Sequence, residues 1–191
     1  MTPDRSNGST ERVFIALEVP RLVREELTAW LRTAAIGPGT RPVEASRMHL
    51  TLCFLGEREP REIALAEQAM AEAARPLDPV RTGAPVWLPQ RRPRALAIEV
   101  RDESGELGRL RSELGRSLTE TIAWDESRAF RPHLTVARFG RGARIKRTEL
   151  PPTPSIGYQP EAITLYSSTL DPDGAIYKPL ATTDLPNPAA A

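Results

Sequence analysis

Hydrophobic periodicity predicts a chain in which β-strands and helices alternate. Short apolar runs rich in β-formers predict strands over 12–19, 48–55, 80–88, 94–100, 133–139, 161–170 and 175–181. Apolar residues at helical spacing predict three helices, one beginning after Pro20, one over 60–75 and one capped by Asp102 and ending near Ile122. The tetrapeptide DPDG between the last two strands favours a hairpin turn.

The order of these elements predicts an α+β fold. Strand, helix and strand follow one another from Phe14 and again from Leu96. We therefore expect two similar lobes of antiparallel sheet, with outer helices, flanking a central cleft. A length of 191 residues suits one bilobal domain over 1–191. Within it, the polar segment 1–10 and the Pro/Ala-rich segment 183–191 are expected to be flexible tails.

Composition excludes several classes of protein. A hydrophobic fraction of 40% and a formal net charge of +1 exclude a disordered tail protein and a strongly basic nucleic-acid coat. The single cysteine, Cys53, excludes an internal disulfide framework and a cysteine-rich zinc module. No apolar run approaches the roughly 18 residues of a membrane span, so we expect a cytoplasmic protein without membrane contact. We also expect a monomer. Segment 128–147 has seven basic residues and no acidic one, which suits an anionic ligand.

Both histidines of the chain begin the same kind of tetrapeptide. His49 is followed by Leu-Thr-Leu and His133 by Leu-Thr-Val. Chance would give both histidines this context on the order of once in 10⁴. Side chains alternate between the faces of a strand, so each histidine shares one face with the threonine two positions on. The apolar residues between and after them point to the opposite face and can enter the core.

This arrangement suits phosphate chemistry. Two imidazoles with ordinary pKa values near 6.5 can serve as a base and an acid, and threonine hydroxyls can donate hydrogen bonds to phosphate oxygens. The sequence contains neither an HExxH nor a CxxC motif, so we expect no metal and no cofactor. By alternation Cys53 shares the face of His49, but a buried and inert thiol is the favoured interpretation.

The motifs resemble those of a known family. The opening RVFIAL, the segments MHLTLCFLGE and FRPHLTVARF, and the late SSTLDPDGAIYKPL together cover the chain from about Arg12 to Leu180. They are similar to the two-histidine phosphoesterase superfamily, and within it to the RNA 2′,3′-cyclic phosphodiesterases, also called 2′–5′ RNA ligases. The resemblance implies hydrolysis of 2′,3′-cyclic phosphate ends of RNA or nucleotides to 2′-phosphomonoesters, with RNA ends or cyclic nucleotides as substrates.

The resemblance also implies roles for individual residues. His49 corresponds to the general acid that protonates the departing ribose 3′-oxygen, and His133 to the general base that acts on water. Thr51 and Thr135 would hold the non-bridging phosphate oxygens. Phe14 corresponds to an aromatic residue that lines the nucleotide pocket.

Two arginines are further candidates for the phosphate site. The resemblance implies that Arg138 contributes to it. By strict alternation, however, Arg138 shares the face of Leu134 and Val136, so it reaches the cleft only if the strand twists, bulges or ends there. Arg131 lies on the face of His133 but precedes Pro132, which marks a strand start or edge.

The same two motifs also suit other functions. A two-histidine site could instead join 2′–5′ RNA ends or hydrolyse a cyclic ADP-ribose phosphate. A nucleotide-binding module without turnover is a third possibility, although a binder does not need both a proton donor and a proton acceptor.

Overall fold

The computed structural model describes residues 9–126, 129–140, 143, 145, 149–171 and 174–186. Its elements, in chain order, are β1 (Glu11–Leu17), α1 (Arg21–Thr33), β2 (Thr40–Pro42), the single 3₁₀ turn η1 (Ala45–Arg47), β3 (Leu50–Arg58), α2 (Pro60–Ala73), β4 (Val80–Leu88), β5 (Ala95–Arg101), α3 (Glu106–Ile122), β6 (His133–Phe139), β7 (Gly157–Tyr158), β8 (Ala162–Thr169) and β9 (Ile176–Asp184).

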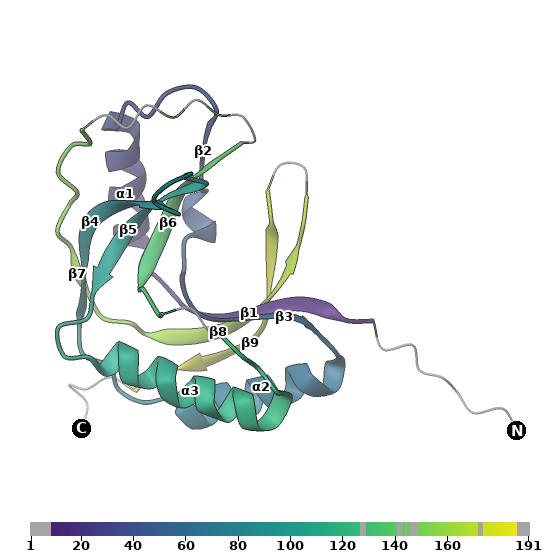
Figure 1. Ribbon diagram of the computed structural model, residues 1–191. Coiled ribbons are helices and arrows are strands. Elements are labelled where there is room, and N and C mark those ends of the chain that lie inside the picture. Colours follow the sequence, from purple (N-terminus) through teal and green to yellow (C-terminus); the bar gives the residue numbers. More distant parts are fainter. Residues whose placement is uncertain are drawn as a thin grey trace, which may run out of the picture.

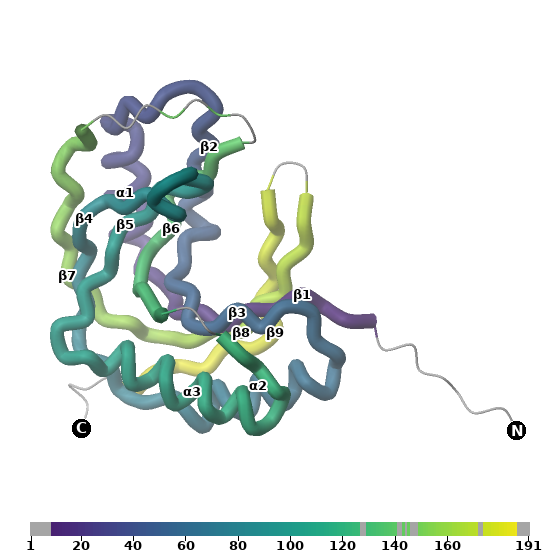
Figure 2. Tube along the Cα trace, in the orientation of Figure 1, coloured from purple at the N-terminus to yellow at the C-terminus, as the bar shows by residue number. Residues whose placement is uncertain are grey.

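The strands form one curled antiparallel sheet that divides into two halves (Figure 1). The order across the sheet is β7-β4-β5-β6-β3-β1-β8-β9, with β2 pairing on β6. The two halves are joined where β3 pairs with β6, and the register there has the single pair Leu50 and Leu134. From that seam β6 runs away from β3 (Figure 2). The predicted α+β class and bilobal plan are confirmed, with the lobes sharing one sheet.

Each half of the sheet is covered by a helix that follows, in the chain, a strand of the other half. Helix α1 follows β1 in the chain but packs against β6 and η1, whereas α3 follows β5 and packs against β3 and α2. Helix α2 covers β1, β8 and β9. The leucines of α3 at 107, 110, 114 and 118 are all 1% exposed or less, so this helix supplies much of the core beneath β3. Because the helices cross over, the two halves are interlocked.

Several boundaries differ from those predicted. Strand β3 begins at Leu50, so His49 lies just before it, after η1. At the other end of the chain, β9 continues to Asp184 and Leu185 is 7% exposed, although a tail was expected from 183. The expected tail residues 1–8 and 187–191 lie outside the described residues. Strands β2 and β7 were not predicted, because three and two residues are too few to show a period.

Helix α3 begins later than expected. Its N-cap is Gly105, whose φ of 77° lies in the left-handed region that glycine tolerates. The Asp102 carboxylate nevertheless accepts a hydrogen bond from the Gly108 amide at 2.9 Å, so it satisfies one free N–H of the first turn from outside the helix.

Candidate active site

The two histidine tetrapeptides lie side by side at the seam of the sheet. Because Leu50 pairs with Leu134 in an antiparallel ladder, residues on either side of these leucines face the same surface. The apolar positions are buried and the polar positions are half-buried, as alternation predicts. The buried set is Leu50, Leu52, Leu134 and Val136, and the half-buried set is His49, Thr51, His133 and Thr135.

Both imidazoles are held in the same orientation by backbone carbonyls. His49 Nδ1 lies 2.8 Å from the Arg47 carbonyl oxygen, and His133 Nδ1 lies 2.7 Å from that of Arg131. A carbonyl can only accept, so Nδ1 carries the hydrogen in each ring. The Nε2 atom of each histidine is therefore left to accept or release a proton. In both halves of the site, the carbonyl two residues before the histidine accepts the hydrogen bond that orients the ring.

Each tetrapeptide ends in a β-bulge, at the equivalent fourth position. On β3, Thr51 pairs with Ala16 and Cys53 with Ile15, so Leu52 is an extra residue. On β6, Thr135 pairs with Ala97 and Ala137 with Leu96, so Val136 is the extra residue. A bulge shifts the alternation by one position, and it therefore turns Cys53 and Ala137 into the core.

The bulges decide which side chains reach the polar face. Arg138 is exposed, because the bulge at Val136 returns it to the side of His133 and Thr135. This is the condition under which Arg138 was expected to reach the cleft. Arg131 is also exposed and contributes its carbonyl to His133. Arg41 on β2 pairs directly with Arg138, so the two like charges share one face, and neither makes an ion pair within the described residues. Such a pair favours an anion.

An aromatic cluster surrounds His49. The ring of Phe14 lies 4.8 Å from the His49 ring and 5.2 Å from that of Tyr166, where distances join centroids. Tyr177 meets the His49 ring edge-on at 5.2 Å. The Tyr166 hydroxyl donates a hydrogen bond to the Glu18 carboxylate. Neither tyrosine was predicted as a site residue, because only the pairing of β8 with β1 brings Tyr166 beside Phe14.

The charges around His49 act in opposite directions. Burial is the largest cause that lowers the pKa of His49 from 6.5, and the positive charges of Arg138 and His133 lower it further. The Arg47 carbonyl and the Glu18 carboxylate raise it. The neutral imidazole is thus favoured in the free protein. A bound phosphate would add negative charge beside the ring and favour the protonated form.

We expect two charge-removing substitutions to move the His49 pKa in opposite directions. Arg138→Gln removes a positive charge and should raise this pKa, whereas Glu18→Gln removes a negative charge and should lower it. NMR titration of the His49 ring measures both shifts, with Arg116→Gln on the outer face of α3 as the control. Shifts in the same direction would refute the electrostatic account. Adding inorganic phosphate to the unaltered protein should raise the pKa of His49.

Sequence comparison identifies the family. Residues 20–171 match the sequence profile of the 2′-5′ RNA ligase superfamily. The chain belongs to that superfamily. An Archaeoglobus fulgidus protein named RNA 2′,3′-cyclic phosphodiesterase is 31% identical over 175 residues, which cover 88% of this chain and 97% of the relative. A protein of the same name from Escherichia coli K12 is 31% identical over 175 residues, covering 89% and 94%.

A solved structure shows that the superfamily fold is present. The crystal structure of E. coli LigT complexed with 3′-AMP matches with a TM-score of 0.79 at 24% identity, over 92% of this chain and 98% of LigT. The resemblance drawn from the two tetrapeptides is confirmed at the level of superfamily and fold.

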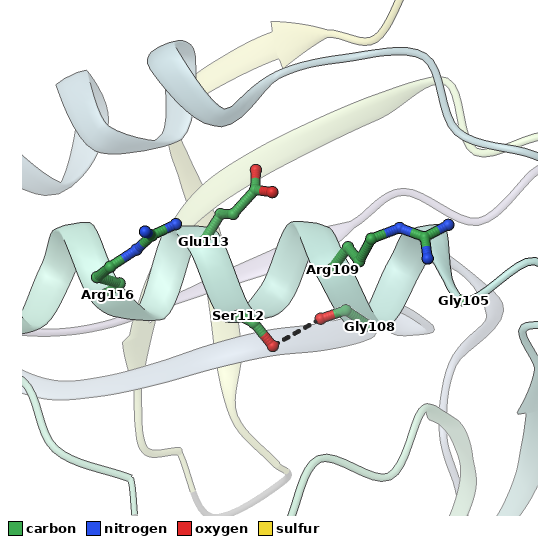
Figure 3. A pocket seen from close by; sticks show the side chains of 6 residues that line it. All are labelled: Gly105, Gly108, Arg109, Ser112, Glu113 and Arg116. Carbon is green, nitrogen blue, oxygen red and sulfur yellow. Dashed lines mark hydrogen bonds between the residues drawn. The ribbon is translucent and has the colours of Figure 1, made fainter.

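Two further features of this superfamily member are a buried thiol and a surface hollow. Burial raises the pKa of Cys53 to about 12, which keeps the thiol protonated. A hollow of about 570 Å³ lies along the outer face of α3, where Arg109, Glu113 and Arg116 project (Figure 3). Neither histidine lines it. Within the described residues there is no cluster of three histidine, cysteine or carboxylate side chains that could hold a metal, and no helix long and apolar enough to cross a membrane.

The basic segment 128–147 is described only in part. Arg131 and Arg138 are among the described residues, and Arg128, Arg141, Arg144, Lys146 and Arg147 lie outside them. The anionic ligand expected for this segment therefore stays a prediction.

Proposed function

We propose that this protein hydrolyses 2′,3′-cyclic phosphate ends of RNA, leaving a 2′-phosphomonoester and a free 3′-hydroxyl. The observation that carries the proposal is the pair of His-Leu-Thr segments at one seam, each with Nδ1 held by a carbonyl and with no hydrogen bond at Nε2 within the described residues. The proposal is supported by membership of the superfamily and by relatives named RNA 2′,3′-cyclic phosphodiesterase.

The proposed reaction is an in-line displacement at phosphorus. His133 Nε2 accepts a proton from water while the water oxygen forms a bond to phosphorus. The bond between phosphorus and the 3′-oxygen breaks, and His49 Nε2 gives its proton to that oxygen. The two imidazoles end in exchanged protonation states, and proton exchange with solvent restores them. Every proton in this sequence is carried by one of the two histidines, so no metal or cofactor takes part in it.

The neighbouring groups bind the phosphate and the nucleoside. The hydroxyls of Thr51 and Thr135 would donate to the two non-bridging oxygens, and Arg138 would balance their charge. Arg131 is a second candidate for contact with the same anion. The ring of Phe14 would lie along the terminal base, with Tyr166 and Tyr177 completing that wall. We also predict that the protein is cytoplasmic and monomeric.

We expect a 2′,3′-cyclic nucleotide to yield only the 2′-monophosphate, at an undiminished rate in excess chelator. The first result follows from protonation of the 3′-oxygen by His49, and the second from the use of imidazoles alone. Chromatography that separates 2′- from 3′-monophosphates measures the product. A 3′-monophosphate would reverse the assigned leaving group, and activity lost to chelator and restored by a divalent ion would refute the mechanism.

The same experiment separates the alternatives. Binding of the cyclic nucleotide without turnover would indicate a nucleotide-binding module. Turnover of only a cyclic ADP-ribose phosphate, or only ligation of 2′–5′ ends, would indicate a different reaction at the same pair of histidines.

A further inference from the structure

Phe54 lies on the polar face of the sheet, beyond the aromatic cluster. It pairs directly with Phe14 between β3 and β1, and directly opposed residues of an antiparallel pair share a face. Phe14 contacts the His49 ring, so this face is that of the histidines. Phe54 is 38% exposed, whereas Phe14 is 3% exposed. The face thus presents an aromatic ring that the proposed chemistry does not use.

The surroundings of Phe54 suit a nucleotide. The Arg12 guanidinium lies over the Phe54 ring, 4.7 Å from its centroid, and makes no ion pair within the described residues. Glu57 lies directly opposite Arg12 in the ladder, but no ion pair joins them. A ring with a guanidinium over one face offers its other face for stacking on a base and a charge for the phosphate. The backbone is held as well, because the Trp124 indole N–H donates to the Phe54 carbonyl at 2.9 Å. This bond fixes the backbone from which the Phe54 ring projects.

The spacing places Phe54 beyond the terminal nucleoside. It lies five positions after His49, which is roughly 13–16 Å along a strand that contains a bulge. The rings of Phe14 and Tyr177 adjoin the His49 ring, whereas no ring contact joins Phe54 to His49 within the described residues. A base that stacks on Phe54 must therefore belong to a nucleotide that precedes the terminal one in the strand.

We propose that Phe54 and Arg12 bind a base and phosphate upstream of the cyclic end, so that the enzyme prefers an RNA strand to a cyclic mononucleotide. This inference rests on the proposed function. The bulge at Leu52 then exposes Phe54 for binding of a longer substrate. The bulge at Val136, in the other half of the site, exposes Arg138 for binding of the phosphate.

The test compares two substrates in one series of variants. We expect a short single-stranded RNA with a 2′,3′-cyclic end to have a higher kcat/KM than the cyclic mononucleotide. Phe54→Ala should lower kcat/KM for the RNA roughly five- to thirtyfold, as expected for loss of one stacked base. It should change the mononucleotide reaction less than twofold. Phe54→Trp should keep the preference, and Leu22→Ala, which removes an exposed side chain of α1, should have no effect.

The outcomes separate this inference from the proposed function. Equal effects of Phe54→Ala on the two substrates, or none on the RNA, would overturn the upstream site while leaving hydrolysis intact. If neither substrate is hydrolysed, the proposed function fails. Affinity then tests the site alone, because Phe54→Ala should still weaken binding of a 2′-phosphate-ended RNA and not of the 2′-mononucleotide. Arg12→Gln should reduce the salt dependence of RNA binding by about one unit of slope.

Discussion

Replacing either His49 or His133 by alanine is expected to lower turnover by about 10²–10⁴-fold, the usual contribution of a positioned proton-transfer group. Each ring moves one proton in the proposed displacement, so neither can substitute for the other. The double variant should be far less than multiplicatively worse, because the two residues act as a unit. Steady-state hydrolysis of a 2′,3′-cyclic nucleotide measures all three variants.

Asparagine variants separate proton transfer from structure. The Asn side-chain amide can donate to the carbonyl that now holds Nδ1, but it has no titratable nitrogen in place of Nε2. His49→Asn and His133→Asn should therefore lose as much activity as the alanine variants while unfolding at a temperature nearer that of the unaltered protein. Near-normal turnover in any folded variant would contradict acid–base catalysis and favour the binding module.

Replacing Arg138 by alanine should lower kcat/KM about 10- to 100-fold, because a hydrogen bond to a charged group contributes roughly 1.5–3 kcal/mol. Arg138→Lys should recover only part of the loss, since an ammonium cannot donate in parallel to two phosphate oxygens. The exposed side chain makes little contribution to the core, so thermal unfolding should be unchanged.

The matched control for Arg138 is Arg116→Ala. Arg116 lines the hollow along α3, away from both histidines, and its loss should leave kcat/KM within twofold. Full activity of Arg138→Ala would show that the exposed guanidinium does not engage the substrate. A large effect of Arg116→Ala would mean that the hollow on α3 takes part in binding.

Local patterns in the sequence predicted much of the fold and the centre of the site. The leucine stripe of α3 and the runs that became β1, β4, β5 and β6 are long enough to show a clear period. Alternation alone predicted that His49 and Thr51 would lie opposite Leu50. These inferences succeeded because each depends on residues close together in the chain.

The rest depends on pairing between distant strands. The two bulges are visible only as register shifts against β1 and β5, and without them Cys53 is wrongly placed on the face of His49. Glu18 and Tyr166 meet across 148 positions of sequence, so neither carries a local sign of the site. Arg41 lies on a three-residue strand whose partner, β6, is far along the chain.

The pairing of Leu50 with Leu134 relates the two halves by a local two-fold axis, because each leucine meets its own equivalent. Two copies of one chain make an isologous contact of this kind in a symmetric dimer. A half-length chain with a single histidine tetrapeptide would thus complete a two-histidine site by docking against a second copy of itself. The two bulges lie at positions related by the same axis, and the side chains they expose, Phe54 and Arg138, are where the two halves differ.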